Sequence, residues 1–254
     1  PSGFRGEGAV DDAQDGIGVL IKGPETSILN NSGTITTEQG TDGTAIYAKD
    51  TTLTVNNTGT IVGGIDKASG VILHNRARGT VHGGAVLNVD RVVNNGAFTI
   101  GDAGVVGTTQ VTGNFRNSAK GTIHVDVDPA AATDISDTLD VVGTATITGT
   151  VAPKLINHLP GRAGRQADVI MEGVGDIDLD QVAVTPSAVG QYSLVKIEPG
   201  KLHLAYDIDF ASESVTTLAN DNQTRLAAYF HQLYRGGYMD EAFFNELVAL
   251  EDDP

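Results

Sequence analysis

One short phrase recurs with variations through the first half of the chain, and it constrains the fold more than any other feature. The clearest copies read Ile-Leu-Asn-Asn-Ser-Gly-Thr-Ile at 28–35 and Leu-Thr-Val-Asn-Asn-Thr-Gly-Thr-Ile at 53–61, and three looser copies follow, up to residue 123. A repeat of about this length indicates a solenoid, in which each copy packs against its neighbours along one axis.

One asparagine of each copy marks the same predicted corner. These residues are Asn31, Asn57, Asn75, Asn95 and Asn117. Their irregular spacing argues against helical hairpins and suits short strands joined by turns that tolerate insertions. Asparagine tolerates the left-handed backbone region, and stacked coils would let the amides bond to one another along the axis. An ordinary loop position explains any single asparagine equally well, but five in register favour the corner.

Two apolar columns are predicted to point into the core of the coils. One lies two positions before each marked asparagine, and the other follows each turn. Their members are Leu29, Val55, Leu73, Val93 and Phe115, then Ile35, Ile61, Val81, Ile100 and Ile123. Hydroxyl residues alternate with these apolar residues along the strands, so threonine is expected on the outer face of the coils. With strands spaced by roughly 4.8 Å, about seven coils would form a rod some 35 Å long.

Composition excludes several classes of function. The formal net charge of −16 argues against nucleic acid and anionic membranes as partners, because both need a cationic surface. The chain has no cysteine, which excludes a disulfide framework, a thiolate zinc site and a cysteine nucleophile. No apolar run is long enough for a membrane-spanning helix. Self-repulsion of so acidic a surface favours a monomer.

The pattern changes after about Asp128. Period-2 alternation runs from residue 136 to 151, and further strands are predicted at 167–171, 181–184, 192–197 and 201–206. A helical pattern follows, carried by Leu218, Leu226, Tyr229, Phe230 and Leu233.

Capping signals bound this helix. Asn220 to Gln223 is typical of a capping box, and Gly236-Gly237 should end the helix. Asp240 can cap a second helix that carries Phe243, Phe244, Leu247 and Leu250 on one face.

The phrase Ser-Asp-Thr-Leu-Asp-Val-Val-Gly-Thr-Ala-Thr-Ile-Thr-Gly-Thr-Val at 136–151, with Lys-Leu-His-Leu-Ala-Tyr-Asp at 201–207, resembles the C-terminal region of Gram-negative autotransporter passengers of the pertactin type. The resemblance covers roughly 130–254, and the upstream repeats in general. The chain departs from the family in lacking tryptophan and in the missing proline before Asn220.

This resemblance implies an all-β fold, a right-handed single-stranded parallel β-helix with a hairpin-rich C-terminal cap and a short α-helical linker. We expect coils over 1–130, a cap that assists folding over 131–210, and helices over 211–254 that lead to an outer-membrane β-barrel translocator. That barrel, which is absent from this chain, is the expected partner. The expected location is the bacterial cell surface, the outer membrane or the exterior.

Motifs for chemistry are missing from the sequence: there is no Gly-x-Ser-x-Gly elbow, phosphate loop, dinucleotide fingerprint or His-Glu-x-x-His. His74 and His82 could approach each other across a coil, but exposed histidines are the better interpretation. The acidic runs Asp126-Val127-Asp128 and 176–180 could bind a cation or act as an acid/base pair, although solvated surface is expected for both.

A polysaccharide-cleaving enzyme is an alternative, because β-helices include such enzymes. Its carboxylates would come from Asp50, Asp66 and Asp90, and its cations from three nearby arginines. These arginines are Arg76, Arg78 and Arg91. We favour turn-position acids, because catalysis would require these groups to converge.

Asn30 and Asn56 begin glycosylation sequons, which we interpret as copies of the structural corner. We therefore predict no enzyme, no catalytic residue, no metal and no cofactor. The expected role is structural: to assist secretion and display upstream passenger sequence. The alternatives are an adhesin that binds host or bacterial surfaces, and a stalk for an upstream protease or esterase.

Overall fold

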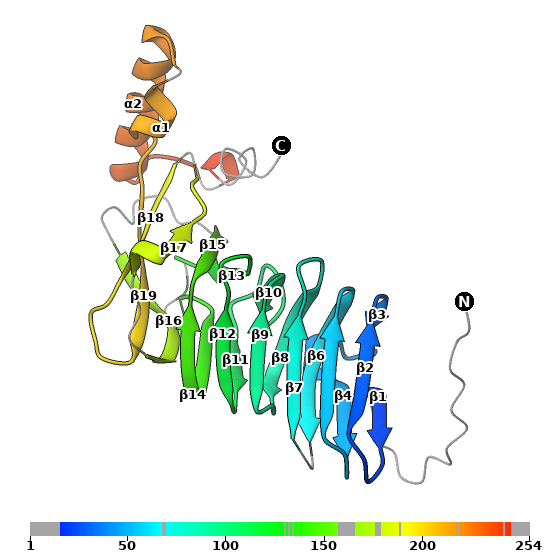
Figure 1. The fold of residues 1–254 in the computed structure, drawn as a ribbon. Coiled ribbons are helices and arrows are strands. Elements are labelled where there is room, and N and C mark those ends of the chain that lie inside the picture. The colour runs from blue at the N-terminus through cyan, green and yellow to red at the C-terminus, as the bar shows by residue number, and fades with distance from the viewer. Residues whose placement is uncertain are drawn as a thin grey trace.

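Strands dominate the computed structural model, and most of them stack in parallel along one axis, consistent with a parallel β-solenoid (Figure 1). The structure describes residues 16–67, 70–129, 131, 133, 135–156, 166–175, 179–187, 189–217, 219–240 and 242–244. Within these residues, no helix has the length and apolar character needed to cross a membrane.

Three parallel ladders run along the stack. The first contains β1 (Ile17–Lys22), β4 (Thr44–Lys49), β6 (Thr60–Lys67), β8 (Thr80–Leu87), β11 (Thr108–Val111), β14 (Thr138–Ile147) and β16 (Gln166–Val174). The second contains β2 (Ser27–Asn31), β5 (Leu53–Asn57), β7 (Val71–Asn75), β9 (Arg91–Asn94), β12 (Asn114–Asn117) and the end of β14.

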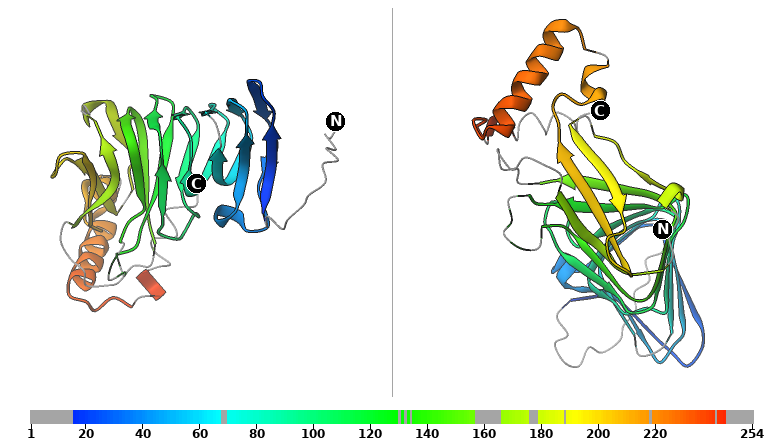
Figure 2. Two further views of the ribbon diagram at one scale, coloured as in Figure 1. Left: turned by 90° about the horizontal axis from the view of Figure 1, so that it is seen from below. Right: turned by 90° about the vertical axis from the view of Figure 1, so that its left-hand side faces the viewer.

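The third ladder contains β3 (Thr34–Ile35), β6, β8, β10 (Ala97–Ile100), β13 (Thr122–Val127), β15 (Gly149–Leu155) and β17 (Val182–Val184). The long strands β6, β8 and β14 each contribute to two ladders. Figure 2 looks along the stack in its right-hand view, where the ladders lie around a common interior. The first and third ladders each hold seven strand segments, in agreement with the predicted number of coils.

Apolar side chains fill this interior in register. One column runs through Leu29, Val55, Leu73, Val92, Phe115 and Ala145, and another through Ile35, Ile61, Val81, Phe98, Ile123 and Val151. All these side chains are buried except that of Leu29, which is half-buried in the first coil. Where the columns meet, the rings of Phe98 and Phe115 pack edge to face with centroids 5.2 Å apart. Burial of these columns supplies the main driving force for stacking.

Threonine lies on the outside, as predicted. Along the third ladder, the residue just before each inward side chain lies on the outer face. These residues are Thr34, Thr60, Thr80, Ala97, Thr122 and Thr150. Thr34 is exposed and the others are half-buried.

The fourth copy of the phrase lies one residue earlier than the sequence pattern indicated. The corner residue is Asn94, not Asn95, because Asn75 pairs with Asn94. Ile100 is buried in the core as predicted, although Phe98, two residues earlier on the same face, takes the position opposite Val81 in the column. The prediction of Val93 as an inward-facing residue was wrong, since Val92 occupies that position. A shift of one residue moves every side chain of a strand to its opposite face.

A spacing rule explains this correction. In the copies with tight turns, glycine follows the corner asparagine by two residues, as in Asn31 with Gly33 and Asn57 with Gly59. Asn94 with Gly96 obeys the same rule, whereas Asn95 does not. In all three pairs the glycine N–H donates to the asparagine Oδ1, which closes the turn.

The corner asparagines form a continuous buried row of hydrogen bonds. Each Nδ2 donates to the Oδ1 of the next residue in the row, at 2.8, 2.9, 2.7 and 2.7 Å from Asn31 through Asn57, Asn75 and Asn94 to Asn117. The last amide donates to the carbonyl of Thr148 at 2.7 Å, so the row ends on backbone. Except for Asn31, which is 8% exposed, these side chains are fully buried, and their hydrogen bonds offset the cost of that burial.

Parallel pairing continues beyond residue 130, where the repeat phrase fades. Strand β14 follows the coils in register, and its Leu139, Val141, Ala145 and Ile147 are buried, as the alternation predicted. The arrangement changes at β16, which pairs in parallel with β14 but antiparallel with β19 (Lys201–Ile208). A hairpin of β18 (Gly190–Val195) with β19 completes this end of the stack.

A helical segment follows β19 and projects beyond the stack (Figure 1). The short α1 (Glu213–Thr216) precedes α2 (Asp221–Arg235), which begins with the predicted capping box between Asn220 and Gln223 and ends at Gly236. Asp240 accepts a hydrogen bond from the N–H of Phe243, so the predicted second cap is also confirmed. Leu218, Leu247 and Leu250 lie outside the described residues.

Aromatic rings attach the helices to the end of β19. Phe210 lies 5.9 Å from Tyr234 and 5.6 Å from Phe244, measured between ring centroids, and Tyr234 stacks on Phe244 at 5.1 Å. All three side chains are at most 5% exposed. Beside them, Arg235 Nη2 lies 3.2 Å from Asp207 Oδ2. The helical segment is therefore packed against the strands rather than merely joined to them.

The asparagine row predicts a sharp contrast between two adjacent residues. Asn94→Ala should reduce the free energy of unfolding by about 3 kcal/mol, because it leaves the buried Asn75 donor and the Asn117 acceptor each short of a partner. Asn95→Ala removes a half-buried acceptor for Ser118 and should cost about 1 kcal/mol or less. Urea unfolding followed by circular dichroism measures both; equal losses would contradict the assignment of the corner.

Candidate functional site

The histidines considered as a metal pair lie on different ladders. His74 belongs to β7 in the second ladder, whereas His82 belongs to β8, where it faces Thr99, with His124 beyond. Partial burial, with Arg76 and Arg91 nearby, lowers the pKa of His74. Burial also lowers the pKa of His124. In the described part of the chain, no three His, Asp or Glu side chains gather closely enough to hold a metal ion.

The acidic and basic residues considered for polysaccharide cleavage have separate partners. Asp66 accepts a hydrogen bond from Asn88 at 3.0 Å, and Asp90 forms an ion pair with Lys67. Arg76 instead donates to Asn56 of the neighbouring coil. Asp50 is an exposed turn residue with φ of 55°, as its interpretation as a turn-position acid predicted. Arg78 and Arg91 are exposed.

The acidic runs give a mixed result. Asp126 was expected on the solvated surface, but it is only 6% exposed, and its carboxylate accepts the N–H of Gly104. The prediction was wrong because the loop between β10 and β11 covers this end of β13. Asp128 is half-buried and Asp180 is exposed, while Asp176 and Asp178 lie outside the described residues.

The sequon asparagines are distinct from the corner row. Asn30 is exposed and Asn56 is half-buried, and Asn56 Nδ2 donates to Asn30 Oδ1 at 3.0 Å. They form the first rungs of an outer row, on the face opposite that of Asn31 and Asn57. These two sequons therefore lie on the outer face of the stack, and the buried corner belongs to the residue that follows each of them.

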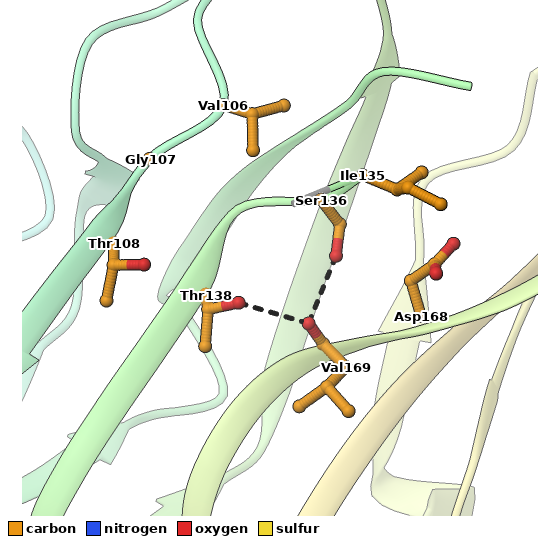
Figure 3. Close-up of a pocket in the computed structure, with 8 residues that line it drawn as sticks. All are labelled: Val106, Gly107, Thr108, Ile135, Ser136, Thr138, Asp168 and Val169. Atoms are coloured by element: carbon orange, nitrogen blue, oxygen red, sulfur yellow. Dashed lines mark hydrogen bonds between the residues drawn. The ribbon is translucent and has the colours of Figure 1, made fainter. Parts of the chain in front are cut away.

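A polar pocket of about 460 Å³ opens where β16 separates from β14 (Figure 3). These two strands pair only from Leu139 with Met171 onward, so the segments that precede these residues diverge. The described lining of the pocket comes from the start of β11, the start of β14 and the first half of β16. These residues are Val106, Gly107, Thr108, Ile135, Ser136, Thr138, Asp168 and Val169.

Two hydroxyl groups hold the diverging strands together at the base of this pocket. Ser136 Oγ donates to the carbonyl oxygen of Val169 at 3.0 Å, and Thr138 Oγ1 donates to the same oxygen at 3.2 Å (Figure 3). These side-chain bonds take the place of the backbone ladder, which resumes at Leu139.

Asp168 supplies the carboxylate of the pocket. Its Oδ2 is enclosed by protein and accepts no hydrogen bond. Burial raises the pKa of Asp168, while a hydrogen bond from Tyr206 and the nearby His203 act in the opposite direction. The carboxylate is therefore held in a site that leaves its charge incompletely compensated.

Behind the pocket, a second carboxylate fixes the 101–107 loop to the coils. Asp137 is fully buried, and its two oxygens accept the N–H groups of Gly107 and Asp126, each at 2.7 Å. Burial raises the pKa of Asp137 to about 7, although both hydrogen bonds favour the charged form. The nearby Asp126 raises the pKa further, since two buried carboxylates disfavour joint ionisation.

Sequence reasoning missed this grouping of Asp137, Asp168 and the two hydroxyls. Ser136-Asp137-Thr138 reads as the polar start of a strand, and its burial depends on the 101–107 loop, which is distant in sequence. The arrangement offers hydrogen-bond acceptors and negative charge. Among the described residues, no histidine is hydrogen-bonded to Ser136 or Thr138 as nucleophilic catalysis would require.

The raised pKa of Asp137 predicts how stability changes with pH. Its folded-state pKa of about 7 lies above the ordinary value of 3.8, so folding favours the protonated acid. The resulting stabilisation is fully present below about pH 4 and is lost as the pH rises through 7. Asp137→Asn should therefore flatten the fall in the free energy of unfolding between pH 5 and pH 8. Urea unfolding across this pH range measures the change in the free energy of unfolding. Asp140→Asn, outside the pocket, should keep the wild-type dependence on pH. An unchanged dependence on pH in Asp137→Asn would contradict the raised pKa of Asp137.

Comparisons with known proteins give no relative. Neither the known protein-family models nor the curated protein sequences match this chain. Its function must therefore be inferred from the architecture and from the residues themselves.

Proposed function

We propose that this chain is the membrane-proximal part of an autotransporter passenger, which folds at the cell surface as a right-handed single-stranded parallel β-helix and displays upstream passenger sequence. The observation that carries this proposal is the difference between the two ends of the stack. One end is covered by antiparallel strands and packed helices, and the other presents strand edges without described partners. Such a polarity suits a rod that folds from its covered end.

The order of the strands supports a helical path for the chain. Successive strands visit the first, second and third ladders in turn, as β1, β2 and β3 do before β4 returns to the first ladder. Parallel strands joined through such connections take the right-handed path almost without exception. The proposed hand follows from this rule.

The edges at the start of the stack support the display of further coils. Within the described residues, β1, β2 and β3 each pair with a single strand, which belongs to the next coil. Asn31 also begins the amide row, and its Oδ1 accepts only the N–H of Gly33 among the hydrogen bonds of the described residues. A preceding coil with an asparagine at the same corner would extend both the ladders and the row.

The opposite end supports a role in folding. Strand β19 pairs on both sides, with β16 and with β18, and its Leu202, Leu204 and Tyr206 are buried in the core. The rings of Phe210, Tyr234 and Phe244 extend this packing into the helices. These contacts give the last coils a stable surface on which earlier coils can stack. The translocator barrel remains the proposed partner beyond the helices.

Folding from the covered end predicts different kinetics for two matched substitutions. Leu204→Ala, in the antiparallel strands, and Leu53→Ala, in the second coil, each remove a fully buried leucine and should cost about 3 kcal/mol. Leu204→Ala should slow refolding, because its contacts form before the rate-limiting step, whereas Leu53→Ala should chiefly speed unfolding. Refolding and unfolding after urea jumps measure both rates. Slower refolding in Leu53→Ala than in Leu204→Ala, or equal effects of both on refolding, would refute folding from this end.

Display at the surface predicts a labelling pattern in intact cells. These 254 residues contain no cysteine, so Thr34→Cys adds one exposed thiol to them, and Val55→Cys adds a fully buried one. In Gram-negative cells that express the full-length gene product, a membrane-impermeant maleimide should label Thr34→Cys without lysis. The buried control should react only after denaturation. Reaction of Thr34→Cys only after lysis would exclude display.

A further inference from the structure

Three hydroxyl groups line the polar pocket, and two of them, those of Ser136 and Thr138, have already used their protons. Ser136 and Thr138 both donate to the carbonyl of Val169, at 3.0 and 3.2 Å. A hydroxyl has one proton and two lone pairs, so each oxygen retains acceptor capacity only. Where Ser136 and Thr138 meet Val169, the pocket therefore presents hydroxyl oxygens that can only accept, while the hydroxyl of Thr108 takes no part in these bonds (Figure 3).

The carboxylate of Asp168 adds charge to these acceptors. When ionised it can only accept hydrogen bonds, and its Oδ2 receives none. No Lys or Arg of the described chain forms an ion pair with it. Asp137 and Asp126 lie behind the pocket as further buried acids. The described part of the site is thus rich in carboxylates, and His203 is the basic residue there that acts on the pKa of Asp168.

Water alone is an incomplete occupant for such a site. Water fills polar pockets of this size and can donate two hydrogen bonds, but it brings no charge to a carboxylate that burial destabilises. Anionic ligands are disfavoured by the negative charge of Asp168. A group with several donors, a positive charge and no acceptor complements the hydroxyl oxygens of Ser136 and Thr138 and this carboxylate.

We propose that this pocket binds a primary ammonium group, which donates to Ser136 Oγ and Thr138 Oγ1 and lies beside the carboxylate of Asp168. An ammonium has three donors and no acceptor, and a charge-assisted hydrogen bond is about twice as strong as a neutral one. The ammonium does not need to reach the enclosed Oδ2, since its charge acts on the whole carboxylate. A free amine and a lysine side chain share this chemistry.

Binding to this site depends on pH in a defined direction. Burial raises the pKa of Asp168, so Asp168 loses its charge at a higher pH than an ordinary aspartate does as the solution is acidified. The other titratable groups around it are His203 and Tyr206 on β19, and Asp126 and Asp137 behind the pocket. Ionised Asp137, whose pKa burial raises to about 7, also attracts a cation, so affinity should decrease as the pH falls from 8 to 5.

The test uses the full chain labelled with ¹⁵N and titrated with cadaverine at pH 8 and low salt. Amide shifts should saturate at Gly107, Thr108, Ser136 and Val169. Tetramethylammonium has the same charge as one ammonium group but no N–H, and it should not produce these shifts. Equal shifts with tetramethylammonium, or none with cadaverine, would overturn the proposal. Repeating the titration with Nα-acetyl-lysine methylamide shows whether a lysine side chain can enter the site.

Matched variants locate the binding. Asp168→Asn keeps the shape of the side chain and should weaken cadaverine binding roughly tenfold or more, because it removes the charge. Asp140→Asn, whose carboxylate bonds to Gln110 outside the pocket, should bind as the wild type does. If Asp168→Asn does not fold, Ser136→Ala should still weaken binding several-fold. If either Asp168→Asn or Ser136→Ala folds and binds cadaverine as tightly as the wild type does, the proposal is overturned.

Discussion

The buried row of asparagine amides is the constraint on which the rest of the structure depends. An amide that enters an apolar interior is unfavourable unless its donors and acceptors are matched, and here each side chain bonds to the same residue of the next coil. The row therefore holds the coils in one register, because a slip of one residue would leave buried amides without partners and turn the apolar columns outward. Hydrophobic burial drives the stacking, and the amides decide which stacking is allowed.

The two ends of the stack meet different physical conditions. Parallel pairing leaves open strand edges at each end, and such edges invite association with other chains. At the C-terminal end, β16 pairs in parallel with β14 on one side and antiparallel with β19 on the other, and the helices pack on Phe210. The polar pocket opens where the first half of β16 diverges from β14 and pairs with β19 alone, so the candidate binding site lies beside the antiparallel cover of the stack.

Carboxylates gather where β16 diverges from β14. The chain carries a large negative charge, and three carboxylates, Asp126, Asp137 and Asp168, lie wholly or partly buried around the divergence. Two of them hold the 101–107 loop through backbone N–H groups, so they act as structural acceptors. Asp168 differs because one of its oxygens has no hydrogen bond. The charge of Asp168 is therefore less compensated than that of the two structural acids, which is why the proposed ligand is cationic.

The sequence by itself determined the stack of short strands, the asparagine corner in four of five copies, most of the inward columns and the helix caps, because each depends on local spacing. The fourth copy shows the limit of that reasoning: adjacent Asn94 and Asn95 both fit the phrase, and only pairing with Asn75 selects between them. The tertiary structure alone decided the burial of Asp126 and Asp137 and the meeting of Ser136 with Val169. These contacts join segments more than ten residues apart, whose approach depends on how the loops and β16 leave the stack.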